Sequence, residues 1–346
     1  MTQRALPRAG AALLALLWAL APMAAAAQSA KSTAREPARP SARASSPVVK
    51  TPWGDPDLQG IWLNATVTPL ERPAGLANKP FLTEAEAAAF EKQILTQREE
   101  NERAPRAGEV GAYNNAWFDQ GTKVVSTRQT SLVVDPPDGR VPVRPEAEKI
   151  RDDNLARNGD SYEYMSVWDR CISRGMPGAM FPAGYNNAYQ ILQSPGYVVI
   201  LHEMIHEVRI IPLDRRPHLP SDITQWMGDS RGHWEGTTLV IETTNFGKKG
   251  WIATSGASGR IKGIPQSETL RVVERFTPGG DAIQYEVTVE DPAVYFRPWK
   301  VAMPLGRDQS YQMFEYACHE GNYAMANILN GARTQAPGAD PPSKPK

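Results

Sequence analysis

The amino-acid sequence predicts a mainly β protein, an antiparallel β-barrel with a few peripheral helices. Short runs of β-branched and aromatic residues recur from residue 122 onward, and turns containing Gly or Pro separate them. Such runs are typical of strands joined by tight turns, and several in succession favour a sheet that curls into a sandwich or barrel. Only two segments carry helical signals, so we expect the helices to lie at the periphery.

The chain begins with the features of a secretory signal peptide. Arg4 and Arg8 precede an apolar stretch over residues 9–21, and small residues at 25–27 provide a cleavage site. We therefore predict a signal peptide over residues 1–27 and a periplasmic or secreted protein. No later stretch is long and apolar enough to span a bilayer, so no membrane span is expected.

Two segments flank the predicted folded region. Residues 28–50 are rich in Ala, Ser, Pro, Lys and Arg and have little to bury, and residues 335–346 are similar. Such composition predicts a disordered linker and a disordered tail. The remaining residues, 51–334, have the length of one large domain, which we predict to be a single β-rich domain with helical insertions.

The two helical insertions are predicted near residues 83–103 and 145–157. Thr83 and Glu86 have the spacing of a capping box, and a sequence rich in Ala and Glu follows them. Pro145 suits the first turn of a helix, and the Asn-Gly pair at residues 158–159 suits a helix end.

Four hairpins are predicted, because strand-like runs flank short turns rich in Gly and Pro. They cover residues 130–141, 188–201, 227–244 and 270–289.

Residues 202–206 read His-Glu-Met-Ile-His, the letter pattern of a zinc-metalloprotease helix. The flanking runs are rich in Val and Ile and bounded by Pro, which indicates strands instead. We predict that the chain reverses near residues 205–207, so that Glu203 cannot act as a zinc-protease base. A metal-dependent hydrolase using His202, His206 and His319 is the least favoured function, and no cofactor is predicted.

The two cysteines and the charge balance limit the compartment and the partners. Cys171 and Cys318 are the only cysteines, and Lys plus Arg and Asp plus Glu each number 38. In an oxidising compartment such a pair favours a disulfide, and two buried thiols are the alternative. Zero net charge without a dense basic block argues against nucleic acid as a partner. The expected partner is a small-molecule ligand or substrate, and the oligomeric state is not predicted.

Five motifs stand out, PWGDPDLQG (52–60), GDSRGHWEG (228–236), ETTNF (242–246), VVERF (272–276) and YACHEGNY (316–323). Together they resemble a large group of uncharacterised secreted bacterial proteins, over about residues 52–333. The resemblance implies a secreted, β-rich protein and implies no activity for any residue. Residues 60–62, Gly-Ile-Trp, also resemble the lipocalin-type Gly-x-Trp signature of a first barrel strand, which implies a calycin-like barrel closed at one end by the Trp.

Histidines with charged neighbours supply the candidate catalytic groups. His206, His233 and Asp229 are predicted as acid–base residues, because such chemistry uses a His whose pKa is set by nearby charges. The alternative for each His is an ordinary polar residue of a loop or strand end. Glu274 is predicted as a base on an otherwise apolar strand face, where burial raises a carboxyl pKa. Its alternative is the partner of a buried Arg.

Polar candidates for substrate binding lie near the same residues. Arg209 and Arg231 are predicted to orient an anionic or carbonyl group, with His218 beside them. Asp229, Arg231 and His233 alternate, so they share one strand face. An interior face would mark a functional site, because burying such groups is costly unless they are paired. An exterior face would carry ordinary salt bridges.

Tyr185 and Trp168 are the aromatic candidates for substrate binding, in a cluster around Cys171. Such a cluster would line a pocket for a flat or sugar-like ligand, or pack as a plug. The predicted function is a secreted or periplasmic enzyme that acts on a small organic molecule in a barrel cavity. It would use His, Asp and Glu acid–base chemistry, as a lyase, isomerase or hydrolase. The alternative is a calycin that binds a small ligand without chemistry.

Overall fold

Strands in one antiparallel sheet dominate the computed structural model, which describes residues 48–101 and 118–335. All of these lie in the unit that spans residues 44–346. The predicted signal peptide, most of the predicted linker (28–47) and most of the predicted tail (336–346) lie outside the described residues. The strands are β1 Gly60–Leu63, β2 Val133–Asp135, β3 Ala188–Ser194, β4 Tyr197–His202, β5 Val208–Pro212, β6 Asp229–Glu235, β7 Thr238–Thr244, β8 Arg271–Pro278, β9 Ala282–Glu290 and β10 Trp299–Arg307.

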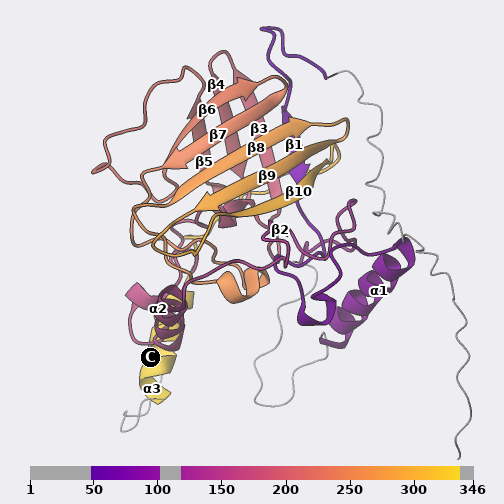
Figure 1. Cartoon of the computed structure of the whole chain (residues 1–346). Coiled ribbons are helices and arrows are strands. Elements are labelled where there is room, and N and C mark those ends of the chain that lie inside the picture. Colours follow the sequence, from indigo (N-terminus) through magenta and orange to yellow (C-terminus); the bar gives the residue numbers. More distant parts are fainter. Residues whose placement is uncertain (1–47, 102–117, 336–346) are drawn as a thin grey trace, which may run out of the picture. The chain divides into compact units, whose positions relative to one another are not determined.

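The sheet curls into a nearly closed barrel, which confirms the predicted fold class (Figure 1). The strand order is β5-β4-β3-β1-β10-β9-β8-β7-β6, and β2 pairs with β10 beside this path. β5 and β6 therefore flank the seam of the barrel. Across that seam the Arg209 guanidinium donates a hydrogen bond to Ser230 Oγ at 3.3 Å, so side chains join the two strands there.

The two predicted helices are present, and a third was not predicted. In α1, Glu84–Asn101, the Thr83 amide donates to Glu86 at 2.9 Å and the Glu86 amide donates to Thr83 Oγ1 at 3.3 Å, the reciprocal bonds of a capping box. α2, Pro145–Ala156, has proline in its first turn. The third helix is α3, Ala324–Gln335. The short 3-10 helices are η1 Ala74–Leu76, η3 Tyr162–Tyr164, η4 Gly178–Met180, η5 Met204–His206 and η6 Gly256–Ile261.

Three predicted hairpins are confirmed as β3–β4, β6–β7 and β8–β9, and β4–β5 reverse at η5 as predicted. The hairpin predicted over residues 130–141 is wrong, because its first half, β2, pairs with β10. β10 was not predicted and contains Pro304. On the β1 and β2 side, β10 pairs only at positions before Met303 and after Leu305, so Pro304 interrupts no ladder there.

The barrel interior is filled by apolar side chains. Trp62, Phe276, Tyr285 and Trp299 are fully or almost fully buried inside it. Trp62 donates from Nε1 to Leu58 O at 2.9 Å, and the Arg307 guanidinium lies 4.7 Å from its ring centroid. The tryptophan of the Gly-x-Trp sequence thus packs inside the barrel beneath an arginine.

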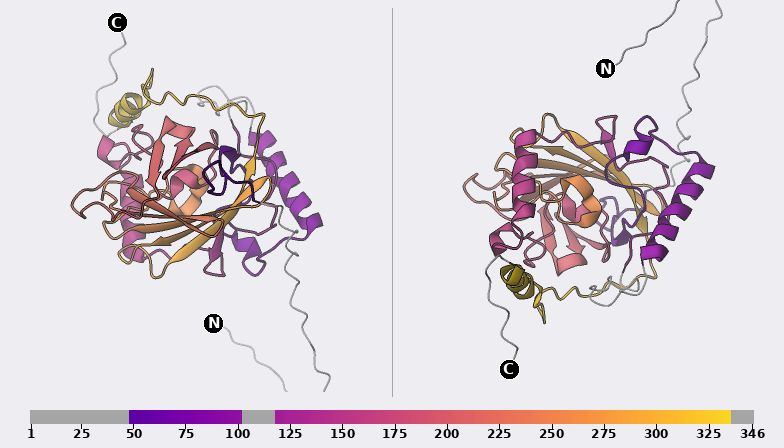
Figure 2. Two further views of the ribbon diagram at one scale, coloured as in Figure 1. Left: turned by 90° about the horizontal axis from the view of Figure 1, so that it is seen from above. Right: turned by 90° about the horizontal axis from the view of Figure 1, so that it is seen from below.

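Four connections leave the strands at one end of the barrel, which we call the mouth, and run over residues 64–132, 136–187, 245–270 and 291–298. The connection over residues 213–228 starts at the other end, where short turns join β3 to β4, β6 to β7 and β8 to β9. Seen from below, α1 (purple) and α2 (magenta) lie on opposite sides of this loop layer, with η6 (orange) between them (Figure 2). None of the helices in the described part of the chain has the length and apolar character needed to cross a bilayer.

Candidate functional site

Two of the predicted site residues, Arg209 and Glu274, form an ion pair inside the barrel. Both side chains are almost completely buried. Arg209 Nη1 donates to Glu274 Oε1 at 3.1 Å, and the Tyr285 hydroxyl donates to the same oxygen at 3.0 Å. Glu274 is therefore the partner of a buried arginine, which was the alternative to its predicted role as a base. This pair joins β5 to β8 across the interior.

Four other predicted residues come together on the outer face of β6 and β7. Asp229, Arg231 and His233 point outward, whereas Ser230 between them faces Arg209 in the interior. Asp229 accepts from His218 Nδ1 at 2.9 Å and pairs with Arg231 at 2.6 Å. His218, Arg231 and His233 line a surface pocket of about 250 Å³.

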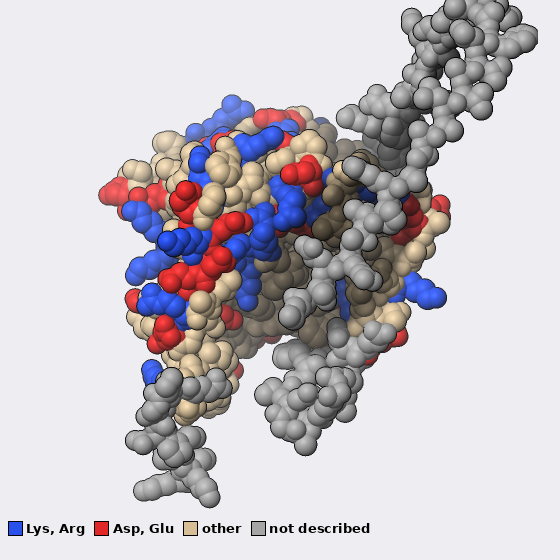
Figure 3. Space-filling model, turned by 60° about the horizontal axis from the view of Figure 1, so that its bottom comes forward, with Lys and Arg blue, Asp and Glu red and all other residues tan. Residues whose placement is uncertain are grey.

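Because Asp229, Arg231 and His233 lie on the outer face, the expectation from the sequence is that they form ordinary salt bridges. The His233 imidazole lies 3.2 Å from Glu235, which also pairs with Arg275. Arg271 pairs with Glu242 in the same row. Side chains of both signs are also interspersed on the face of the molecule that Figure 3 shows. In these contacts, the charged side chains of the outer face pair with one another.

The His-Glu-Met-Ile-His segment is a strand end and a tight turn. β4 ends at His202, η5 covers 204–206, and Ile205 and His206 have φ values of +63° and +45°. A β-branched residue at positive φ is uncommon and costs backbone strain. His202 is buried while His206 is exposed. Among the described residues, no cluster of three or more His, Cys, Asp or Glu side chains could hold a metal ion.

Aromatic side chains gather at the mouth, among them Trp168 and Tyr185, the two predicted for substrate binding. Tyr185 contacts three rings, with centroid distances of 6.3 Å to Phe118, 6.0 Å to Trp168 and 6.2 Å to Tyr316. A disulfide between Cys171 and Cys318 joins the segments that carry Trp168 and Tyr316, as predicted. His206 Nδ1 donates to Tyr316 O at 2.9 Å, so the strained turn contacts the same segment.

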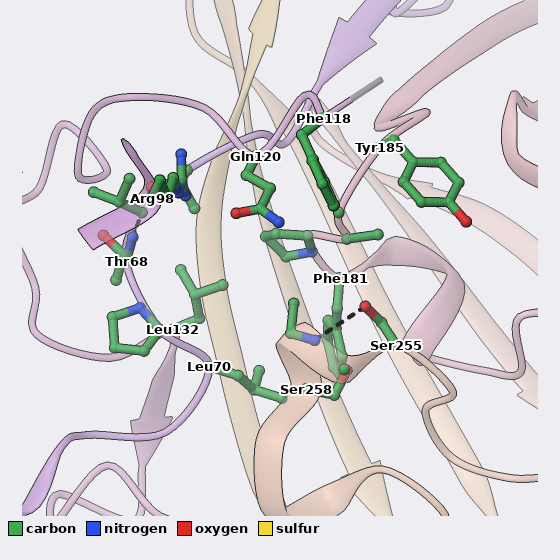
Figure 4. Close-up of a pocket in the computed structure, with 18 of the residues that line it drawn as sticks. Thr68, Leu70, Arg98, Phe118, Gln120, Leu132, Phe181, Tyr185, Ser255 and Ser258 are labelled. Carbon is green, nitrogen blue, oxygen red and sulfur yellow. Dashed lines mark hydrogen bonds between the residues drawn. The ribbon is translucent and has the colours of Figure 1, made fainter. Parts of the chain in front are cut away.

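Two hollows adjoin this aromatic group, and Trp168 and Tyr185 line both. The larger, which we call the mouth pocket, has a volume of about 450 Å³ (Figure 4), and the other about 390 Å³. Figure 4 shows Phe118 and Phe181 reaching into the mouth pocket from one side and Arg98 lying at the other. Its remaining polar side chains are those of Thr66, Thr68, Gln120, Tyr185, Ser255 and Ser258.

Beneath the mouth lie three ionisable groups: the half-buried Glu207 and the buried Arg174, neither of which was predicted, and the buried His202, which the sequence offered only as a metal ligand. Burial is the main cause that raises the pKa of Glu207 to about 7, although Ser173 Oγ donates to its carboxylate at 3.2 Å. Burial, followed by the positive charge of Arg209, lowers the pKa of His202 to about 3. Arg174 is buried in the same region. Only their nearness in sequence to His206 and Cys171 could have indicated Glu207 and Arg174, since burial of a charge leaves no sequence pattern.

Replacing Glu207 with glutamine is expected to change how stability depends on pH. With a pKa of about 7 against 4.5 for an ordinary glutamate, Glu207 contributes stability that is lost as pH rises through that range. His202, at about 3 against 6.5, contributes stability that is lost as pH falls. The two effects oppose each other between about pH 4.5 and 6.5, so Glu207→Gln should leave stability rising with pH.

Urea denaturation at several pH values across that window measures this slope, with the exposed Glu320→Gln as control. An unchanged slope in Glu207→Gln, equal to that of Glu320→Gln, would show that Glu207 carries no linked proton.

Comparisons of the chain with protein-family models, with curated proteins and with solved structures find no match.

Proposed function

We propose that this protein binds a small, flat organic molecule in the mouth pocket. The observation that supports this is the hollow of about 450 Å³ lined by Phe118, Trp168, Phe181 and Tyr185 together with a few hydroxyl groups. Ligand sites are commonly concave, largely apolar and aromatic, with a small number of polar groups that fix orientation. The proposal places the ligand at the mouth rather than inside the barrel, because buried aromatic side chains and the Arg209–Glu274 pair fill the interior.

An enzymatic role, as a lyase, isomerase or hydrolase that needs no cofactor, is the second candidate, although its candidate acid–base group, Glu207, is not among the residues that line the mouth pocket. Glu207 favours it, because a carboxyl group with a pKa of about 7 suits general acid–base catalysis at neutral pH. Glu207 directly follows the strained turn at Ile205 and His206, and strained backbone is often found at functional sites. The disulfide supports a periplasmic or secreted location for either role.

Isothermal titration calorimetry of the disulfide-intact chain tests ligand binding. The probes are 1-naphthoate, 1-naphthamide, indole-3-acetate and indole-3-acetamide, and at least one is expected to bind. Tyr185→Ala should weaken that binding by about tenfold or more, because it removes the ring that contacts three other aromatic rings.

Tyr197→Ala is the matched control, because Tyr197 is a partly exposed residue of the β3–β4 turn outside the pocket. It should leave the affinity unchanged. The proposal fails when none of the four probes binds, or when both tyrosine variants bind as the unmodified chain does.

A further inference from the structure

Among the described residues, the lining of the mouth pocket contains a positive charge and no carboxylate. Of the described residues that line it, Arg98 is the only charged one. Arg98 Nη1 donates to Gly121 O at 2.7 Å, and Arg98 forms no ion pair with any described residue. Partial burial lowers the pKa of its guanidinium. A half-buried cation whose hydrogen bond within the described residues goes to a backbone carbonyl retains donors for an anion.

A second cation, Arg174, lies directly behind the pocket wall. Its guanidinium carbon is 5.1 Å from the ring centroid of Trp168, which lines the pocket. Its Nε donates to Thr254 Oγ1 at 3.2 Å, and the next residue, Ser255, lines the pocket. Arg174 is therefore separated from the pocket by Trp168 on one side and by the segment at Thr254 and Ser255 on the other. Its side chain is among the most buried charged groups of the chain, at 3 % exposure.

Arg174 differs from the other two buried arginines in its lack of partners. Arg209 pairs with Glu274, and Arg72 donates to Thr130 Oγ1 and to the carbonyl oxygens of residues 77 and 137. Arg174 forms no ion pair within the described part of the chain, and its Nη2 is buried without a hydrogen-bond partner. Burying a charge is costly unless it is paired, so this arrangement gains from a nearby anion.

Ser258 gives an independent sign of a missing polar partner. It lines the mouth pocket, is 3 % exposed, and its hydroxyl is buried without a hydrogen-bond partner. Ser255, close by, already accepts from the amide of Ala257 at 3.2 Å (Figure 4). Buried polar groups are nearly always hydrogen-bonded, so an unsatisfied hydroxyl on a residue that lines a hollow indicates a missing ligand or water.

We propose that the ligand of the mouth pocket is a flat organic carboxylate, which pairs with Arg98, while a water or another polar atom of the ligand satisfies Ser258. Arg174 stabilises the same anion through the electrostatic field behind Trp168. The inference rests on the proposed function and names its ligand class. A carboxylate suits the site because arginine binds it through two parallel hydrogen bonds, and because the hollow supplies aromatic surface for the rest of the molecule.

The first test compares 1-naphthoate with 1-naphthamide, which share a ring system and differ in charge. Titration of the disulfide-intact chain should show naphthoate binding at least about tenfold more tightly, the equivalent of one additional charge-assisted contact. Added NaCl should weaken naphthoate binding and leave naphthamide binding unchanged. Equal affinities for the two probes overturn the carboxylate inference and leave the proposed function standing, whereas failure of both probes and of the indole pair removes both.

Arginine variants show which positive charge contributes to naphthoate binding. Arg98→Gln should reduce the naphthoate affinity at least tenfold, and Arg174→Met should reduce it several-fold, with naphthamide binding unchanged in both. Arg174→Met should also unfold at the same or a higher urea concentration, since an unpaired buried cation is lost. Arg140→Gln, an exposed arginine outside the pocket, controls for net charge. A loss of naphthoate affinity in Arg140→Gln equal to that in Arg98→Gln overturns the inference.

Discussion

Replacing Glu274 with alanine is expected to lower the free energy of unfolding by about 3–5 kcal/mol. The carboxylate is fully buried and accepts from Arg209 and from the Tyr285 hydroxyl. Removing it leaves the Arg209 guanidinium as an uncompensated charge inside the barrel and the Tyr285 hydroxyl without its acceptor. Urea denaturation with the disulfide intact measures the effect.

Two controls separate the ion pair from the loss of side-chain volume. A double variant with leucine at both 209 and 274 removes both charges, and we expect it to regain much of the lost stability, because no charge stays unpaired. Glu235→Ala breaks the exposed pair with Arg275 and should change stability little. A Glu274→Ala chain as stable as Glu235→Ala would contradict the assignment of this pair as a barrel-closing contact.

The pair also explains how the barrel holds together at its seam. Arg209 lies on β5, at one side of the seam, and its hydrogen bonds reach Ser230 on β6 and Glu274 on β8. Gly232 on β6 lies beside Ile211 of β5, so apolar contacts continue along the same line. Side-chain contacts therefore join β5 to β6 at the seam, whereas backbone hydrogen bonds join the other neighbouring strands.

Local patterns predicted most of the strands, and the exceptions have physical causes. Alternating β-branched runs with Gly or Pro turns located three hairpins, and the capping box located α1. Pro304 concealed β10, because proline inside a strand usually argues against one. α3 was not predicted, and its attachment through the disulfide depends on contacts distant in sequence.

The candidate site was predicted in part. Trp168 and Tyr185 were found because aromatic residues cluster near Cys171 in the sequence as well as in space. Alternation along β6 shows that Asp229 and His233 share a face, but two-residue periodicity cannot say which face is interior. Arg98 and Arg174 were missed, since each reaches the pocket from a different segment and only the fold brings the segments together.

Replacing both Cys171 and Cys318 with serine is expected to cost about 2–5 kcal/mol in the free energy of unfolding. The two cysteines are 147 residues apart, and closing so long a loop lowers the entropy of the unfolded chain by the equivalent of about 4–5 kcal/mol. Urea denaturation of the double variant, compared with that of the oxidised chain, measures the loss. A midpoint equal to that of the oxidised chain would contradict this estimate.

How much of that loss appears depends on whether the C-terminal segment stays in place without the bond. Glu203 accepts from the Tyr311 hydroxyl and from the Phe314 amide, each at 2.9 Å, and His206 bonds Tyr316 O. If these contacts fail, the native state also gains freedom and the stability loss falls below the loop-entropy value. We expect partial release, seen as faster hydrogen exchange over residues 311–335 with the barrel strands still protected. Because Tyr316 stacks on Tyr185, that release should also weaken binding of 1-naphthoate, which links the disulfide to the mouth of the barrel.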